Sequence, residues 1–145
     1  MRRALAVAAL VLPLLAGCGG DQQDAYCGAV KDHQQELGDL VGSGAPDALL
    51  KALPVFRDLQ AEAPDDITDE WQQVVGRISA LGDALDDAGV DPATYDRDRP
   101  PSGLTEEQKA RIDAAAKELG SGTTLRALQD LDQHARDVCH TALTL

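Results

Sequence analysis

The sequence predicts an all-α fold, an up-down four-helix bundle with a short extra helix in the connection before the last helix. Three observations support this prediction. Apolar residues recur at alternating steps of three and four along several long stretches, which is the spacing of one helix face. No stretch of any length alternates apolar and polar residues as a half-buried strand does. An even pair of cysteines, Cys27 and Cys139, lies near the two ends of the helical region.

The first two helices are separated by a glycine-rich break. Residues 24–41 have helical apolar spacing, and His33 occupies one position of the apolar stripe. Residues 42–44 (Gly-Ser-Gly) end this helix, and Pro46 suits the first turn of the next one. Pro54 is expected to kink the second helix, because proline removes a backbone donor and crowds the preceding turn. The apolar positions of this helix are Leu49, Leu50, Leu53, Phe56 and Leu59.

The third helix has the clearest pattern. Residues 67–88 keep the alternating spacing for several turns, with acidic residues in the first turn, where they complement the helix dipole. Trp71 is the only tryptophan and lies on the apolar stripe of this helix. We therefore expect Trp71 to be a core residue and not a platform for a ligand.

A long connection and two more helices complete the chain. Residues 90–103 contain three prolines and are predicted to be irregular. Thr105 followed by Gln108 is a capping-box pattern, which opens a short helix ending at Leu119. After another Gly-Ser-Gly break, the last helix is expected over residues 123–143.

The cysteine pair constrains the topology. We expect a disulfide between Cys27 and Cys139, which requires their Cα atoms to lie within about 7 Å of each other. The last helix must then run towards the end of the bundle at which the first helix begins, and the long connection must lie at the opposite end. Two free thiols or a metal site are the alternatives for these cysteines.

The N-terminal residues have the form of a secretory signal. A short basic head, Met1–Arg3, precedes the uncharged run Ala4–Leu15, which is too short to span a bilayer as a helix, since that needs about 20 residues. The segment Leu15-Ala16-Gly17-Cys18 resembles the lipobox of bacterial lipoproteins. In that class the cysteine receives a diacylglyceryl group on its sulfur, and the signal peptide is cut immediately before it. An ordinary secretory signal with a chance cysteine is the alternative.

The resemblance implies a lipid-anchored protein on the extracytoplasmic face of a bacterial membrane. Residues 1–17 would be the cleaved signal peptide, residues 18–24 a lipidated tether and residues 25–145 the helical domain. The membrane is then a partner through the lipid on Cys18. The absence of Asn and the abundance of Ala, Asp and Gly fit a high-GC bacterial genome.

The charge of the chain excludes several partners. The formal net charge is −12, so nucleic acids and anionic lipid surfaces, both polyanions, are not expected to bind. The sequence contains no G-x-S-x-G motif, no phosphate-binding glycine loop and no evident nucleophile with its base. We therefore expect no enzymatic activity, no catalytic residues and no cofactor.

Two histidines are weak candidates for a metal site. If the first and last helices are antiparallel and joined at Cys27 and Cys139, His33 and His134 lie at nearly the same height. Two imidazoles with a nearby carboxylate could hold a transition metal. No histidine pair with metalloprotease spacing is present, and a hydrogen-bonded structural histidine is the more common case. We therefore predict no metal.

The connection between the third helix and the short helix contains the candidate partner loop. Tyr95, Arg97 and Arg99 lie there among prolines, and Tyr and Arg are enriched at binding hot spots. The topology places this loop far from the membrane. The expected function is thus a non-enzymatic interaction or structural module of the cell envelope, with a possible envelope protein as partner. The alternative is a lipoprotein that binds a small ligand or a metal in the bundle interior near His33 and His134.

Overall fold

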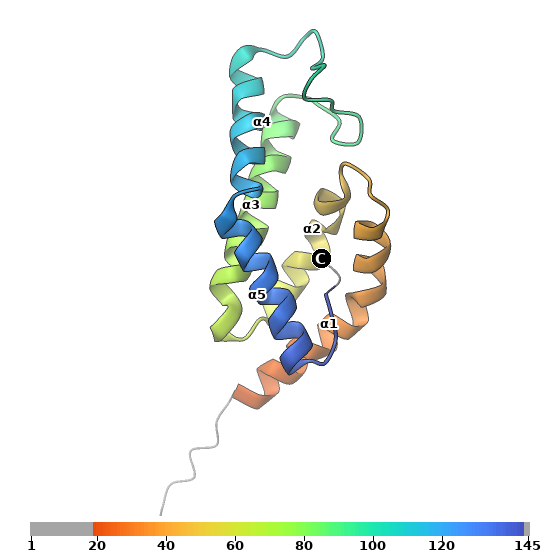
Figure 1. Ribbon diagram of the computed structural model, residues 1–145, viewed down its shortest axis with the longest axis vertical. Coiled ribbons are helices and arrows are strands. Elements are labelled where there is room, and N and C mark those ends of the chain that lie inside the picture. Colours follow the sequence, from red (N-terminus) through yellow and green to blue (C-terminus); the bar gives the residue numbers. More distant parts are fainter. Residues whose placement is uncertain (1–18, 144–145) are drawn as a thin grey trace, which may run out of the picture.

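The computed structural model describes residues 19–143, so the lipobox and Cys18 lie outside the described residues. Within this range the chain forms five α-helices and one 3-10 turn, and no strand is present, which confirms the all-α prediction (Figure 1). The elements in chain order are α1 (Gly19–Gly42), α2 (Ala48–Glu62), η1 (Asp65–Ile67), α3 (Thr68–Asp87), α4 (Glu106–Leu119) and α5 (Gly122–Val138).

Helix α1 begins earlier than the sequence pattern predicts. Residues 19–24, expected to be a polar tether, form its first turns. Asp21 lies in the first turn, where a carboxylate complements the helix dipole. The side-chain amide of Gln22 donates a hydrogen bond to the carbonyl oxygen of Ala63 at 2.9 Å, which holds this turn against the end of α2. The domain therefore begins directly after the predicted lipidation site.

Helix α3 is the central element of the arrangement. It contacts α2, α4 and α5, while α1 contacts α2 and α5. Figure 1 shows α1 and α2 as an antiparallel hairpin on one side of the molecule. On the other side, α4 lies beside the later half of α3 and α5 beside its earlier half, and both run opposite to α3.

Aromatic residues from three helices form the centre of the core. Trp71 is fully buried, which confirms its predicted place in the core, and its indole N–H donates a hydrogen bond to the hydroxyl of Tyr26 at 3.2 Å. The Tyr26 ring meets the Trp71 ring edge to face at a centroid distance of 6.5 Å. Phe56 from α2 lies 5.9 Å from the indole. This cluster joins α1, α2 and α3, and within it the indole N–H of Trp71 and the hydroxyl of Tyr26 satisfy each other.

The C-terminal segment differs from the prediction, because α5 ends at Val138 instead of continuing to residue 143. His140 adopts a left-handed conformation (φ 53°), which ends the helix. The chain then turns back, and the backbone N–H of Leu143 donates to the carboxylate of Asp132 at 3.0 Å. The Leu143 side chain is fully buried in the core. The burial of Leu143 favours this reversal of the chain. If α5 continued as a helix, Leu143 would lie beyond the core.

The two ends of the helical domain meet at the predicted cysteines. The sulfur atoms of Cys27 and Cys139 lie at bonding distance, and their Cα atoms are 5.0 Å apart. Residues 88–105, the connection between α3 and α4, lie at the end of the molecule opposite to the start of α1 (Figure 1).

Candidate functional site

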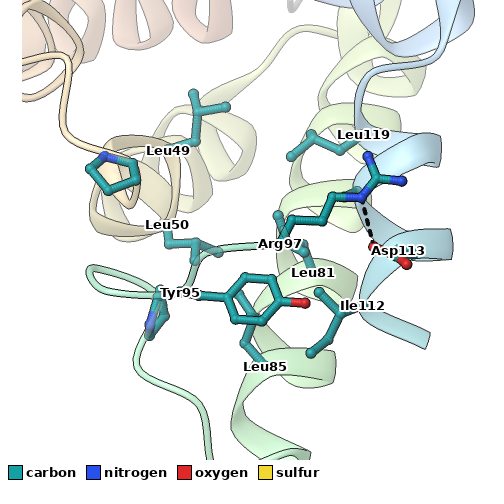
Figure 2. A pocket seen from close by; sticks show the side chains of 12 residues that line it. Leu49, Leu50, Leu81, Leu85, Tyr95, Arg97, Ile112, Asp113 and Leu119 are labelled. Atoms are coloured by element: carbon teal, nitrogen blue, oxygen red, sulfur yellow. Dashed lines mark ion pairs between the residues drawn. The ribbon is translucent and has the colours of Figure 1, made fainter. Parts of the chain in front are cut away.

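An apolar cleft of about 240 Å³ lies at the end of the molecule remote from the start of α1. We call it the distal cleft. Three helices form its walls: the beginning of α2, the end of α3 and the middle of α4 (Figure 2). The main apolar side chains of these walls are Leu49, Leu50, Leu81, Leu85, Ile112 and Leu119.

The α3–α4 connection covers one side of the distal cleft. Two carboxylates shape this loop, since Asp91 accepts a hydrogen bond from the backbone N–H of Ala93 and Asp96 accepts one from that of Asp98, each at 2.9 Å. Such turns are typical of aspartate, whose side chain bonds its own backbone two residues on. The Tyr95 backbone N–H also donates to the carbonyl oxygen of Asp91 at 3.0 Å. These bonds hold the loop in the curve that brings Tyr95 over the cleft.

The Tyr95 ring lies against the cleft leucines and Ile112 instead of projecting into solvent (Figure 2). Its hydroxyl oxygen is buried and has no hydrogen-bond partner among the described residues. The Tyr95 side chain is half-buried, because the two aspartate turns direct it inward. A buried hydroxyl without a partner is uncommon and costs about 1–3 kcal/mol.

A group of charges borders the cleft beside Tyr95. Arg97 Nε lies 3.0 Å from Asp113 Oδ1, and Lys109 Nζ lies 2.6 Å from Asp113 Oδ2. The hydrogen bond from Lys109 lowers the pKa of Asp113 below its ordinary value, and the same bond raises the pKa of Lys109. Both groups are therefore charged at neutral pH. The ion pair between Arg97 and Asp113 fastens the loop to α4 (Figure 2).

The three predicted loop residues have different environments. Tyr95 and Arg97 both line the distal cleft. Arg99 does not line it, and its guanidinium instead pairs with Asp96 at 2.9 Å in a side chain that is 87% exposed. The structure thus places two of the three candidates at one site and the third in a local ion pair of the loop.

The two candidate metal-ligating histidines have separate partners. His33 Nδ1 lies 3.5 Å from Glu36 and its Nε2 lies 3.8 Å from Asp58. His134 Nδ1 lies 3.8 Å from Asp66, and its ring packs edge to face on Tyr26 at 5.8 Å. Among residues 19–143 there is no group of three or more His, Cys, Asp or Glu side chains that could hold a metal ion.

Sequence reasoning missed the cleft itself. The pattern assigned Leu49, Leu50, Leu81 and Leu85 to the core stripes of two helices. Of these, only Leu85 is buried, at 4% exposure, and the other three are half-buried. The signal that the sequence offered was the long connection after α3, which leads to a helix too short to cover the full length of α3. Helix α4 lies beside the later half of α3 and does not pack against α2. The beginning of α2 and the end of α3 therefore remain partly uncovered.

Comparisons with known proteins add no relative. A scan against protein-family models, a search of curated proteins and a search of solved structures each found no match for this chain. In the part of the chain that the structure describes, no helix has the length and apolar character needed to cross a membrane.

Proposed function

We propose that this protein is a lipid-anchored, extracytoplasmic binding protein of the bacterial cell envelope, without enzymatic activity. In this proposal Cys18 is the anchor and the distal cleft is the recognition site, which receives an apolar group of a ligand or of an envelope partner. The single observation that carries the proposal is an apolar cleft that contains a buried hydroxyl without a hydrogen-bond partner among residues 19–143. Binding sites typically combine mostly apolar walls with a few placed polar groups.

The orientation of the helices supports a cleft that faces away from the membrane. Helix α1 begins directly after Cys18 and, with 24 residues, is about 36 Å long. The cleft is lined by the end of α3 and by the α3–α4 connection, which lies at the opposite end of the molecule (Figure 1). A lipid on Cys18 would hold one end of the domain at the bilayer and leave the cleft open to the periplasm or cell exterior.

We further propose that the fold is an up-down four-helix bundle of α1, α2, α3 and α5, with α4 as the short extra helix. The contacts of α5 with both α1 and α3 support this assignment, because they close the bundle. Helix α4 contacts α3 and α5 but not the α1–α2 hairpin. The cleft occupies the place where α4 stands apart from α2.

Site-specific photo-crosslinking in intact cells tests the proposal. A photoreactive side chain at Ala93, an exposed residue of the α3–α4 connection, is expected to form a covalent adduct with the bound ligand or partner. The same group at Leu125, which is 50% exposed on α5, is the control and is expected to yield none. Replacing Cys18 by serine is expected to move the protein out of the membrane fraction and to abolish the adduct with an envelope partner.

A pair of matched variants links any adduct to the cleft. Ala116→Trp should remove the adduct, because Ala116 is an exposed residue that lines the cleft and the indole would fill it. Ala110→Trp places the same side chain at another exposed position of α4, outside the cleft, and should leave the adduct unchanged. An adduct at Ala93 that Ala116→Trp does not affect would refute the distal cleft as the recognition site.

A further inference from the structure

The size of the distal cleft limits its ligand to a small molecule or a short chain. Its volume is about 240 Å³. A cavity of about 150 Å³ accommodates benzene, so this volume corresponds to on the order of ten non-hydrogen atoms. The walls contributed by α2, α3 and α4 are mainly leucine and isoleucine side chains. An unbranched alkyl chain or a single aromatic ring therefore suits the body of the ligand.

The polar group of the ligand is indicated by Tyr95. Its buried hydroxyl has no partner in the described chain, and it can donate one hydrogen bond or accept others. A ligand oxygen at this point would satisfy the hydroxyl and remove the cost of leaving it unpaired. The ligand is therefore amphiphilic, with its oxygen next to the loop and its apolar part between the helices.

The charges at the border of the cleft favour an anion. Arg97 and Lys109 both pair with a single carboxylate, Asp113, and Lys117 lines, with Arg97 and Asp113, a second hollow that shares residues with the cleft. The local charge is thus positive in a protein with a net charge of −12. Salt screens charges beyond about 8–10 Å, so these neighbours matter more than the distant acids.

Two other acids at this end of the molecule are themselves paired with arginines. Asp96 pairs with Arg99 at 2.9 Å, and Asp87 pairs with Arg111 at 3.9 Å. The side chain of Arg97 is 70% exposed while its Nε is paired with Asp113. Since a guanidinium has five N–H donors, Arg97 can keep Asp113 and still donate to a second carboxylate.

We propose that the distal cleft binds an amphiphilic monocarboxylate of about ten non-hydrogen atoms, such as a medium-chain fatty acid. Its tail lies among the leucines of α2 and α3, and its carboxylate lies between the Tyr95 hydroxyl and the Arg97 guanidinium. This inference rests on the proposed function, because it names the ligand class of the same cleft.

Isothermal titration calorimetry with three probes of equal tail length tests the ligand class. The full chain carrying Cys18→Ser is titrated with octanoate, 1-octanol and octylamine. Octanoate is expected to bind with a dissociation constant at least roughly tenfold lower than that of octanol, because a charge-assisted hydrogen bond distinguishes them. Octylamine should bind more weakly than octanoate and octanol, since its ammonium group is repelled by the positive charges of Arg97 and Lys117.

Single substitutions locate the carboxylate. Arg97→Gln should raise the dissociation constant of octanoate to that of octanol and leave octanol unchanged. Tyr95→Phe keeps the ring and removes the hydroxyl, so it should weaken octanoate binding severalfold. Arg126→Gln, which changes an exposed arginine of α5 outside the cleft, is the matched control and should change nothing. Urea unfolding of each variant shows whether it is folded, and the comparison of the three probes on the unsubstituted chain does not depend on any variant.

Two results would overturn the inference without deciding the proposed function. If octanol or octylamine binds as tightly as octanoate, or if Arg97→Gln leaves octanoate binding unchanged, the carboxylate assignment is wrong. If none of the probes binds, a small amphiphile is not the ligand. In both cases the adduct at Ala93 and its loss in Ala116→Trp still test the cleft as a recognition site independently.

Discussion

Removal of the Cys27–Cys139 bridge should destabilise the fold strongly. The bridge joins residues separated by 112 positions, so it closes almost the whole described chain into one loop. We consider the double substitution Cys27→Ser and Cys139→Ser, which leaves no unpaired thiol at this site. Both the reference protein and the double variant carry Cys18→Ser, so Cys27 and Cys139 are the only cysteines of the reference protein.

The magnitude follows from the length of the closed loop. The chain-entropy relation gives about 5 kcal/mol at 25 °C for a loop of this length, and measured values for disulfides are commonly about 2–4 kcal/mol. The bridge also supports the reversed C-terminal segment, in which Ala142 accepts a hydrogen bond from Gln34 of α1 at 3.3 Å. We therefore expect the free energy of unfolding to fall by about 2–5 kcal/mol, equivalent to roughly 8–20 °C in Tm for a domain of this size.

Urea unfolding followed by fluorescence measures this loss directly. Trp71 is the only tryptophan and is fully buried, so its emission reports the unfolding of the core. The oxidised protein, the reduced protein and the double variant are compared, and the last two should agree. A double variant with a free energy of unfolding within about 0.5 kcal/mol of the oxidised protein would refute the reasoning, since ordinary surface substitutions have effects of that size.

Two further predictions concern the core and α4. Burial raises the pKa of Tyr26 to about 12 from 10.0. The stabilisation by the buried neutral Tyr26 is therefore fully present below pH 10. It falls by about 2–3 kcal/mol as the pH rises to 12, because in this range the tyrosine ionises mainly in the unfolded chain. In a Tyr95→Phe background the ultraviolet absorbance of tyrosinate should titrate with a midpoint near pH 12, and a midpoint near 10 would contradict the burial argument. Thr105→Ala removes the N-cap of α4 and should cost about 1 kcal/mol in urea unfolding. Thr123→Ala, whose hydroxyl caps no helix, is the control, and an equal loss in both variants would speak against a specific cap.

The helices and their breaks could be predicted because their signals are local. The capping box of α4 is an example: Thr105 accepts from the backbone of Gln108, and Gln108 accepts from the backbone of Thr105, as the four-residue pattern predicts. The core position of Trp71 followed from the helical spacing around it. Such features depend on residues within one or two turns, and the sequence contains all of them.

The cleft and the end of α5 could not be predicted, because each depends on residues far apart in the chain. The direction of the Tyr95 side chain follows from the turns made by Asp91 and Asp96 and from the ion pair between Arg97 and Asp113 of α4. The helical pattern continued past Val138, and the reversal depends on the burial of Leu143 against other elements and on its backbone hydrogen bond to Asp132. His33 and His134, the weak candidates for a metal site, have separate carboxylate partners, and these partners also depend on residues far apart in the chain.

The two ends of the molecule differ in how firmly the fold holds them. Near the start of α1, the cysteine pair and the aromatic cluster around Trp71 join α1, α3 and α5. At the distal end, α4 buries a single residue, Ile112, whereas α3 buries five. Elements with little buried apolar surface open at low free energy, and sites that must admit a ligand are drawn from such elements. A cleft whose wall is α4 can therefore open while the rest of the core stays intact. Under the proposed function, this difference would give the binding site a means of entry, and it would give the end that carries the Cys27–Cys139 bridge the rigidity to hold the site away from the membrane.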